Sequence, residues 1–280
     1  MVRLSIWRAC FPVLAAGMLA APRAMPDEQP RPPDAQIMYL GNAAILVAQG
    51  QTKILFDPLF RDDYGQYQLV PEELRTRLFE AEPPLDNIDA VLISHAHGDH
   101  FNAVDIITFH RAHPDALIIA PEQALDTMRA TGSVTDQMAA RFVSMDMDYG
   151  DDPINVPFAD LTVEAVRIPH AGGARRRPIQ NIAYRVTLEN TATVMHLGDA
   201  DPGAEDFAAY TTHWQARETD MAFPPYWFFL SLDGKSVISK TLNAAQVTGV
   251  HVPVEVPRIL IETGAAYFDS PGEVRTFLTD

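Results

Sequence analysis

The strongest constraint on this chain is a group of metal-binding residue types, His95-Ala96-His97-Gly98-Asp99-His100, directly after the apolar run at residues 90–94. A short apolar run of this kind predicts a buried strand. In extended backbone the side chains of His95 and His97 point the same way, so both imidazoles can reach one ion at about 2.0–2.1 Å. Gly98 lets the chain turn and bring Asp99 and His100 toward a second ion. The pattern predicts a metal site at a strand end, where α/β sheets place their sites.

A helix start with surface histidines is the simpler alternative, with Asp99 capping a helix predicted at residues 104–111. For a single histidine that alternative would be preferred. Three histidines and one acid within six residues, straight after a buried strand, favour the metal site.

Two hairpin patterns, at residues 44–56 and 182–197, frame the cluster, and each has apolar runs around a turn. The turns are Gln49-Gly50-Gln51 and Glu189-Asn190. Similar Asn-containing tripeptides open both hairpins, and each second strand ends on an acid, which indicates a weak internal duplication. Strands and helices alternate, which predicts an α/β fold. Further strands are expected at residues 90–94, 116–120, 163–168, 220–223 and 250–252, and further helices at 104–111 and 242–247.

The motif His95-x-His97-x-Asp99-His100 resembles the signature of the metallo-β-lactamase superfamily, and further elements follow in the order of that family. After the cluster, His170 precedes Gly172-Gly173, Asp199 follows Gly198, and His251 precedes Pro253. The resemblance extends from Met38 to the region of Pro257, and it implies a four-layer αββα sandwich with pseudo-duplicated halves. It also implies that His95, His97 and His170 hold one metal ion, that Asp99, His100 and His251 hold the other, and that Asp199 bridges them. With Asp199 as a bridging carboxylate, the sequence resembles the lactonase and phosphodiesterase branch of the superfamily, because true β-lactamases lack this carboxylate.

The available ligand types agree with this assignment. The only cysteine, Cys10, lies in an N-terminal segment that is expected to be cleaved, so the metal ligands must be imidazole and carboxylate. The expected cofactors are two divalent ions, Zn²⁺ first, with iron or manganese as alternatives. Two such ions can share one water and lower its pKa toward neutrality, which predicts hydrolysis of an ester, lactone or phosphodiester. Asp99 is expected to orient this water or accept its proton.

Several residues outside the ligand set are expected to support the site. Asp57 can accept the free ring N–H of a ligand from beneath the histidine loop, although it can also be a turn residue before Pro58. His196 is expected to stand behind the turn that leads to Asp199. Residues expected near the substrate are Tyr64, Arg175, Tyr226 and Trp227. The alternatives are a solvated loop for the arginine run at 175–177, and core or a membrane-facing surface for the aromatic run at 223–229.

The net charge and the N-terminal segment indicate which partners and which cellular location to expect. A net charge of −16 makes nucleic acid a poor partner and leaves a small-molecule substrate. Residues 1–24 contain Arg3 and Arg8 followed by a short apolar stretch, which predicts a cleaved signal peptide rather than a stable membrane anchor. Residues 25–34 are rich in Pro and charge and are expected to be a linker, and residues 35–280 are expected to form the metallo-β-lactamase domain. Export to a bacterial periplasm is the predicted localisation.

Two other functions use the same ligands. One is an iron-dependent oxidoreductase of the same fold, because His and carboxylate suit iron as well as zinc. The other is a non-catalytic binding protein that keeps metal ions for structure. Metal analysis distinguishes the iron-dependent oxidoreductase from a zinc hydrolase. Substitution of Asp99 distinguishes the binding protein from an enzyme.

Overall fold

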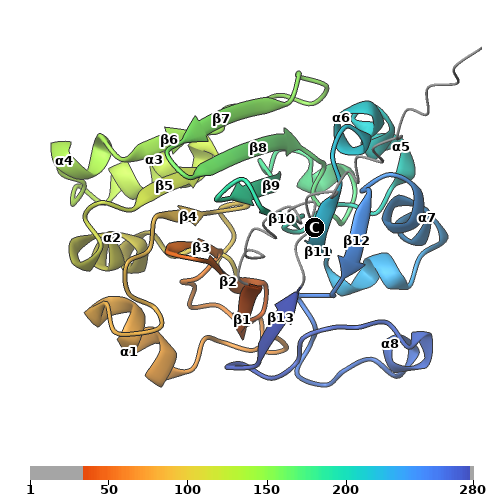
Figure 1. The fold of residues 1–280 in the computed structure, drawn as a ribbon, viewed down its shortest axis with the longest axis horizontal. Helices are drawn as coiled ribbons and strands as arrows, with labels where there is room; N and C mark the ends of the chain where they lie inside the picture. The colour runs from red at the N-terminus through yellow and green to blue at the C-terminus, as the bar shows by residue number, and fades with distance from the viewer. Residues whose placement is uncertain (1–33, 278–280) are drawn as a thin grey trace, which may run out of the picture. The chain divides into compact units, whose positions relative to one another are not determined.

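The computed structural model describes residues 34–277, which form two β-sheets with helices on their outer faces (Figure 1). The first sheet has the strand order β13-β1-β2-β3-β4-β5-β6, and the second has β12-β11-β10-β9-β8-β7. The strands of the first sheet are β1 (Ala35–Gly41), β2 (Ala44–Gln49), β3 (Thr52–Phe56), β4 (Ala90–Leu92), β5 (Leu117–Ala120), β6 (Phe142–Ser144) and β13 (Val274–Phe277). Those of the second are β7 (Ile154–Phe158), β8 (Leu161–Arg167), β9 (Ile182–Leu188), β10 (Ala192–His196), β11 (Thr219–Phe223) and β12 (Ala244–Val247).

The helices form the two outer layers. Those packed on the first sheet are α1 (Glu72–Glu80), α2 (Ala103–Ala112), α3 (Glu122–Ala130) and α4 (Asp136–Ala139). Those that follow β10 are α5 (Ala204–Ala208), α6 (Thr211–Gln215), α7 (Leu232–Lys240) and α8 (Arg258–Thr263), with short 3₁₀ turns η1 (Ala174–Arg176) and η2 (Tyr226–Phe229). Among the described residues, none of the helices has the length and apolarity needed to cross a bilayer.

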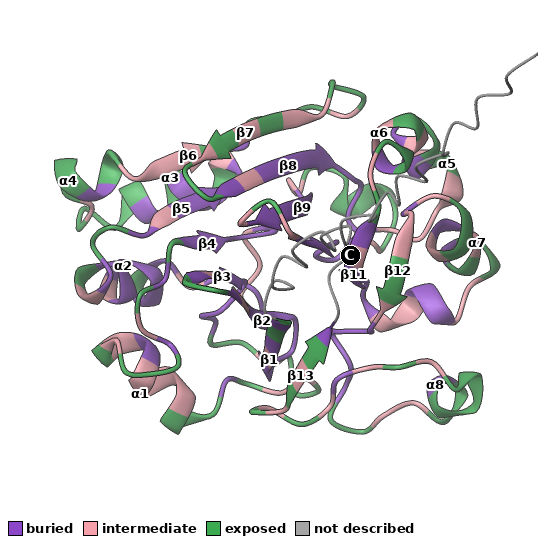
Figure 2. Ribbon diagram, viewed as in Figure 1, coloured by how far each residue is buried: buried purple, intermediate pink, exposed green. Residues whose placement is uncertain are grey.

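Alternation along the strands decides which layer each side chain joins. On β3, Ile54 and Phe56 join the core between the two sheets, whereas Leu55 joins the core under α1, α2 and α3. Successive side chains of a strand point to opposite faces, so a strand that is apolar at every position can be covered on both sides. Figure 2 shows this burial across the central strands of both sheets. The predicted α/β, four-layer αββα fold is confirmed.

The two sheets share one topology, which agrees with the duplication seen in the sequence. In the first, β1, β2 and β3 are antiparallel, and β4 and β5 continue parallel to β3. In the second, β8, β9 and β10 are antiparallel, and β11 and β12 continue parallel to β10. The hairpin turns also meet, because Glu189 Oε1 accepts a hydrogen bond from the backbone N–H of Gln51 at 2.9 Å. Gly50, at φ 56°, leaves room for this carboxylate.

Two of the expected elements are wrong. Residues 242–247 were expected to be helical, but Ala244–Val247 is the edge strand β12, paired in parallel with β11. Asn243, at φ 51°, ends any helical path before it. Residues 250–252 were expected to be a strand, but Val250 makes only an isolated bridge to Pro225. The helical segment in this part of the chain is instead α7, where the Ser231 side chain caps the N-terminus by accepting from the N–H of Gly234. The predicted signal peptide and nearly all of the linker lie outside the described residues.

A buried ion pair joins β8 to β9 beneath α6. Arg185 on β9 donates to Glu164 on β8 at 2.7 and 2.8 Å, and both side chains are almost fully buried. The second guanidinium here belongs to Arg217, which also donates to Glu164. Burial by itself raises the pKa of Glu164, but the hydrogen bond and charge of Arg185 and the charge of Arg217 lower it below its ordinary value.

We expect Glu164→Gln to destabilise the fold by about 3–5 kcal/mol at neutral pH, because it leaves Arg185 as an uncompensated buried charge. Since the folded-state pKa of Glu164 is lowered, its contribution is present above the unfolded pKa and is lost as pH falls through the folded pKa. Urea denaturation at several pH values measures this difference, which should shrink in acid. The exposed Glu218→Gln is the matched control. Equal midpoints for the two variants at neutral pH would contradict the expectation.

Candidate metal centre

Loops that follow the carboxyl ends of strands carry all the predicted ligands. The turn at residues 95–100 follows β4, His170 follows β8, Asp199 follows β10, and His251 follows β12. An isolated bridge between His170 and Ala200 holds two of these loops together. The strand ends therefore gather residues that are far apart in the sequence.

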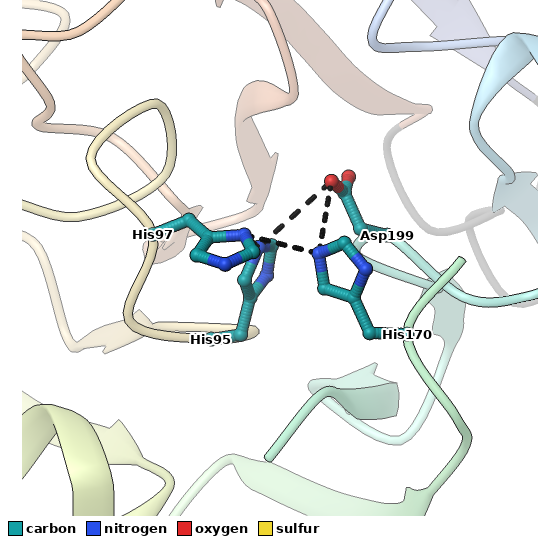
Figure 3. A group of neighbouring side chains, drawn as sticks. All are labelled: His95, His97, His170 and Asp199. Carbon is teal, nitrogen blue, oxygen red and sulfur yellow. Dashed lines mark hydrogen bonds and ion pairs between the residues drawn. The ribbon is translucent and has the colours of Figure 1, made fainter. Parts of the chain in front are cut away.

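The first group of ligand atoms comes from His95, His97, His170 and Asp199 (Figure 3). His97 Nδ1 lies 3.0 Å from His95 Nε2 and 3.0 Å from His170 Nε2. Asp199 Oδ2 lies 3.4 Å from His170 Nε2 and 3.9 Å from His95 Nε2. Tetrahedral ligands at about 2.0–2.1 Å from one ion would be roughly 3.3 Å from each other. The spacing of these atoms therefore suits a tetrahedral cation.

The second group comes from Asp99, His100, His251 and the same Asp199. Asp199 Oδ1 lies 3.1 Å from His100 Nε2 and 3.2 Å from His251 Nε2. Asp99 Oδ2 lies 3.2 Å from His251 Nε2 and 3.7 Å from His100 Nε2. The two oxygens of Asp199 therefore face different groups, which is the arrangement of a bridging carboxylate.

Buried polar atoms without hydrogen-bond partners point to a cation. Among the described residues, His100 Nε2, Asp99 Oδ1 and Asp199 Oδ1 are buried and have no such partner. Leaving buried polar groups unsatisfied costs free energy, and a bound divalent ion would satisfy the imidazole nitrogen and the carboxylate oxygens together. The residues present therefore fit a metal.

Hydrogen bonds on the outer ring nitrogens turn three histidines inward. Asp57 Oδ2 accepts from His100 Nδ1 at 2.8 Å and from the Ser94 hydroxyl at 2.6 Å. Because the Ser94 hydroxyl donates to Asp57, its oxygen accepts from His95 Nδ1 at 3.0 Å. His170 Nδ1 donates to the carbonyl of Ala171 at 2.6 Å. With Nδ1–H engaged in each ring, Nε2 carries the lone pair and faces the centre.

His97 is oriented the other way round. Its Nδ1 faces the first group, and its Nε2 lies 3.0 Å from Nη1 of Arg176. A guanidinium can only donate, so the outer nitrogen of this histidine faces a donor, unlike those of His95, His100 and His170.

The pKa shifts separate the two groups. Burial lowers the pKa of His95 well below its ordinary value, and burial together with the charge of His170 lowers that of His97 to about 4. A lowered pKa favours the neutral form of both rings, which can offer lone pairs. Burial opposes charge on His100 too, but the carboxylates of Asp199 and Asp99 raise its pKa well above the ordinary value. The same carboxylates raise the pKa of His251 despite its burial. The carboxylates of the second group therefore stabilise positive charge among these side chains.

Matching asparagines secure the two ligand loops. Asn42, before β2, donates from Nδ2 to the carbonyl of Asp99 at 2.9 Å. Asn181, before β9, accepts from the N–H of Asp199 at 2.9 Å. His196 also acts on the backbone, since its Nδ1 accepts from the N–H of Gly198 at 3.1 Å. It therefore holds the turn that leads to Asp199 and contacts no ligand side chain by hydrogen bond.

A cavity of about 400 Å³ opens over both ligand groups. Tyr64 and Trp227 line it, as the sequence suggested, and Trp227 is fixed by donating from its indole to the carbonyl of Ala200 at 3.0 Å. Arg175, also expected near the substrate, does not line this cavity, whereas its neighbour Arg176 does. Tyr226 lines an adjacent hollow instead.

Some participants gave no usable signal in the sequence. Ser94 and Gln66 belong to this set, with Ser94 beneath the ligands and Gln66 in the cavity wall. Tyr67 stands edge-on to His251 with ring centroids 4.1 Å apart. Such roles depend on how loops fold over the site. The asparagines could have been found, because their repetition before both hairpins marked them.

His110 and His113, in and just after α2, are both buried. His113 does cap α2, and its Nε2 donates to the carbonyl of Leu78 at 2.8 Å. His113 therefore joins the C-terminal end of α2 to α1.

Comparison with known proteins agrees with the fold. A family model described as the β-lactamase superfamily domain matches residues 52–223. The protein Rv0786c of Mycobacterium tuberculosis is 30% identical over 167 residues, which are 59% of this chain and 64% of that protein. A metal-dependent hydrolase of Thermococcus kodakarensis is 28% identical over 166 residues, which are 59% of this chain and 61% of the relative. The matched segments thus span less than two thirds of these relatives.

A solved structure shows the same fold over a larger share of the chain. A possible metal-dependent hydrolase of Veillonella parvula aligns with a TM-score of 0.61 at 14% identity, over 87% of this chain and 100% of the other. At this identity the likeness concerns the fold.

We expect Asp57→Asn to weaken divalent metal binding about 10- to 100-fold, because an amide has one acceptor oxygen where Ser94 and His100 need two. Competition of Zn²⁺ against a chromophoric chelator measures the affinity. Ser94→Ala, which removes the acceptor of His95 alone, should show a smaller loss. The exposed Asp115→Asn is the control for folding and charge. Metal affinity that is equal in Asp57→Asn and Asp115→Asn would contradict this role of Asp57.

Proposed function

This chain belongs to the metallo-β-lactamase superfamily, and we propose that it is a metal-dependent hydrolase that cleaves an ester, a lactone or a phosphodiester at a binuclear centre. The observation that supports this best is the placement of Asp199, whose two oxygens lie 3.1–3.4 Å from histidine nitrogens of different ligand groups. A carboxylate placed in this way can join two ions. The name of the Thermococcus relative also supports metal-dependent hydrolysis.

The donor set suits two divalent ions. His95 Nε2, His97 Nδ1 and His170 Nε2 would hold one, His100 Nε2, His251 Nε2 and Asp99 Oδ2 the other, with Asp199 between them. Bound ions of this kind supply Lewis acidity and bring the pKa of water close to neutrality. Zn²⁺ is the ion we propose, since nitrogen and oxygen ligands at tetrahedral spacing suit it.

The reaction adds water across a C–O or P–O bond. The water oxygen bonds to the acyl carbon or phosphorus, the bond to the leaving oxygen breaks, and that oxygen takes up a proton. Asp99 is placed to carry the proton, because it lines the cavity and its Oδ1 has no hydrogen-bond partner among the described residues. Trp227 and Tyr67 pack edge-on against His251.

Elemental analysis of the purified protein tests the centre directly. We expect about two zinc ions per chain and turnover of at least one member of a panel that contains a lactone, a phosphodiester, a simple ester and a β-lactam. Asp99→Asn should lower kcat by about 10²- to 10⁴-fold, the range for loss of a general acid–base. Asp115→Asn serves as the matched surface control.

The outcomes separate the alternatives. Iron in place of zinc would favour the oxidoreductase, because the ligand types suit both metals. Bound metal without turnover by the wild type, and with unchanged metal content in Asp99→Asn, would favour a binding protein. Absence of metal would overturn the ligand assignment.

We propose further that the chain is exported and acts in a periplasm. The support is the sequence of residues 1–24, where two arginines precede a short apolar stretch. Expression of the full chain in a Gram-negative host should give a periplasmic product whose mass corresponds to cleavage between residues 21 and 25. An uncleaved product retained in the cytoplasm would contradict export.

A further inference from the structure

We propose that Arg176 forms a subsite for an anionic oxygen group of the substrate, beside the first ligand group. This rests on the proposed function and narrows its substrate class. It favours a phosphodiester, or an ester or lactone that carries a carboxylate, over a neutral ester.

Arg176 is placed at the cavity and has no acidic partner within the described part of the chain. It lines the cavity together with His97, Gly172 and Tyr64. Among residues 34–277, no carboxylate forms a salt bridge with it, although Asp99 and Asp199 line the same cavity. Its side-chain hydrogen bond is to Nε2 of His97 at 3.0 Å. By contrast, Arg167 and Arg177 of the same region lie against the ring of Tyr149.

The contact between Arg176 and His97 holds only while His97 Nε2 can accept. Nδ1 of His97 is the atom that faces the other ligands, so it is the atom that would hold an ion. A neutral imidazole that binds a cation through Nδ1 carries its proton on Nε2. Nε2 then becomes a donor, and the guanidinium beside it loses its acceptor. In the loaded protein Arg176 therefore presents N–H groups to the cavity without a protein acceptor.

The backbone beside Arg176 is shaped to let its side chain cross toward the cavity. Gly172 has φ 104°, a conformation that favours glycine. A Cβ at this position would lie 3.1 Å from Cγ of Arg176. A larger residue would therefore push the arginine stem aside. Gly172 keeps open the path by which the guanidinium reaches His97.

The chemistry of the group that fits follows from the donors. A guanidinium offers paired N–H groups in a plane, which match two oxygens of a carboxylate or phosphate. No other lysine or arginine lines the cavity within the described part of the chain. In a chain of net charge −16, a guanidinium at the cavity gives an anionic substrate a local attraction.

The first test is a binding measurement that does not need turnover. Zinc-loaded wild type, Arg176→Gln and Arg175→Gln are titrated with inorganic phosphate by calorimetry, with zinc content checked in each sample. We expect Arg176→Gln to raise the dissociation constant by about tenfold or more, because it removes a charge-assisted hydrogen bond. Arg175→Gln makes the same charge change outside the cavity and should bind as the wild type does. Arg176→Lys should be intermediate, since it keeps the charge without the planar fork.

The second test compares substrates. The ratio of kcat/KM in wild type to that in Arg176→Gln is measured for bis(4-nitrophenyl) phosphate, for a 4-nitrophenyl ester that carries a carboxylate, and for 4-nitrophenyl acetate. We expect the largest ratio for one of the two anionic substrates, and the one affected tells which anion the subsite takes. Equal ratios for all three would overturn the proposal.

The anion subsite at Arg176 and the hydrolase function can be disproved independently of each other. Phosphate affinity that is equal in Arg176→Gln and Arg175→Gln would overturn the subsite even if the enzyme hydrolyses other substrates. A phosphate affinity that depends on Arg176, in a protein that turns over none of the substrates, would support the anion site and count against the hydrolase.

Discussion

The buried carboxylate of Asp57 is the constraint on which both ligand groups depend. It accepts from the backbone N–H of Ser94 at 2.7 Å, and it also takes hydrogen bonds from the Ser94 hydroxyl and His100. Through Ser94 it fixes His95 of the first group, and directly it fixes His100 of the second. Its position follows from the sheet, because β3 and β4 are parallel neighbours and the N–H of Asp57 donates to the carbonyl of Leu92. Ring orientations at the site are thus set by strand pairing.

The duplicated topology explains where the acids stand and also why their roles differ. Asp57 and Asp199 follow the equivalent strands β3 and β10, and Asn42 and Asn181 precede the equivalent strands β2 and β9. Asp57 lies one residue after its strand and remains beneath the ligands. Asp199 lies three residues after its strand, beyond Gly198 at φ 55°, and this longer reach brings it among the histidines. Two additional residues after the strand therefore place Asp199 between the two ligand groups, whereas Asp57 stays beneath them and supports His95 and His100.

The parts of the site that could be predicted from sequence are those fixed by local geometry or by order along the chain. The spacing from His95 to His100 is local, and Asp57 could be placed because it ends a strand beside this loop. His170, Asp199 and His251 needed the family resemblance. The choice between Arg175 and Arg176 depends on a single 3₁₀ turn, and β12 was misjudged because an exposed edge strand shows no apolar alternation. In these cases tertiary contacts decide what the sequence pattern leaves open.

The same hydrogen bonds give the centre a closed side and an open side. His95 and His100 are fully buried, and their outer nitrogens end on Ser94 and Asp57. His97 is only partly buried, and its outer nitrogen faces Arg176 at the cavity. An approaching molecule can therefore meet the ligand groups from the side of the cavity. His97, which departs from the ring orientation of His95, His100 and His170, thus lies at the cavity beside the guanidinium of Arg176.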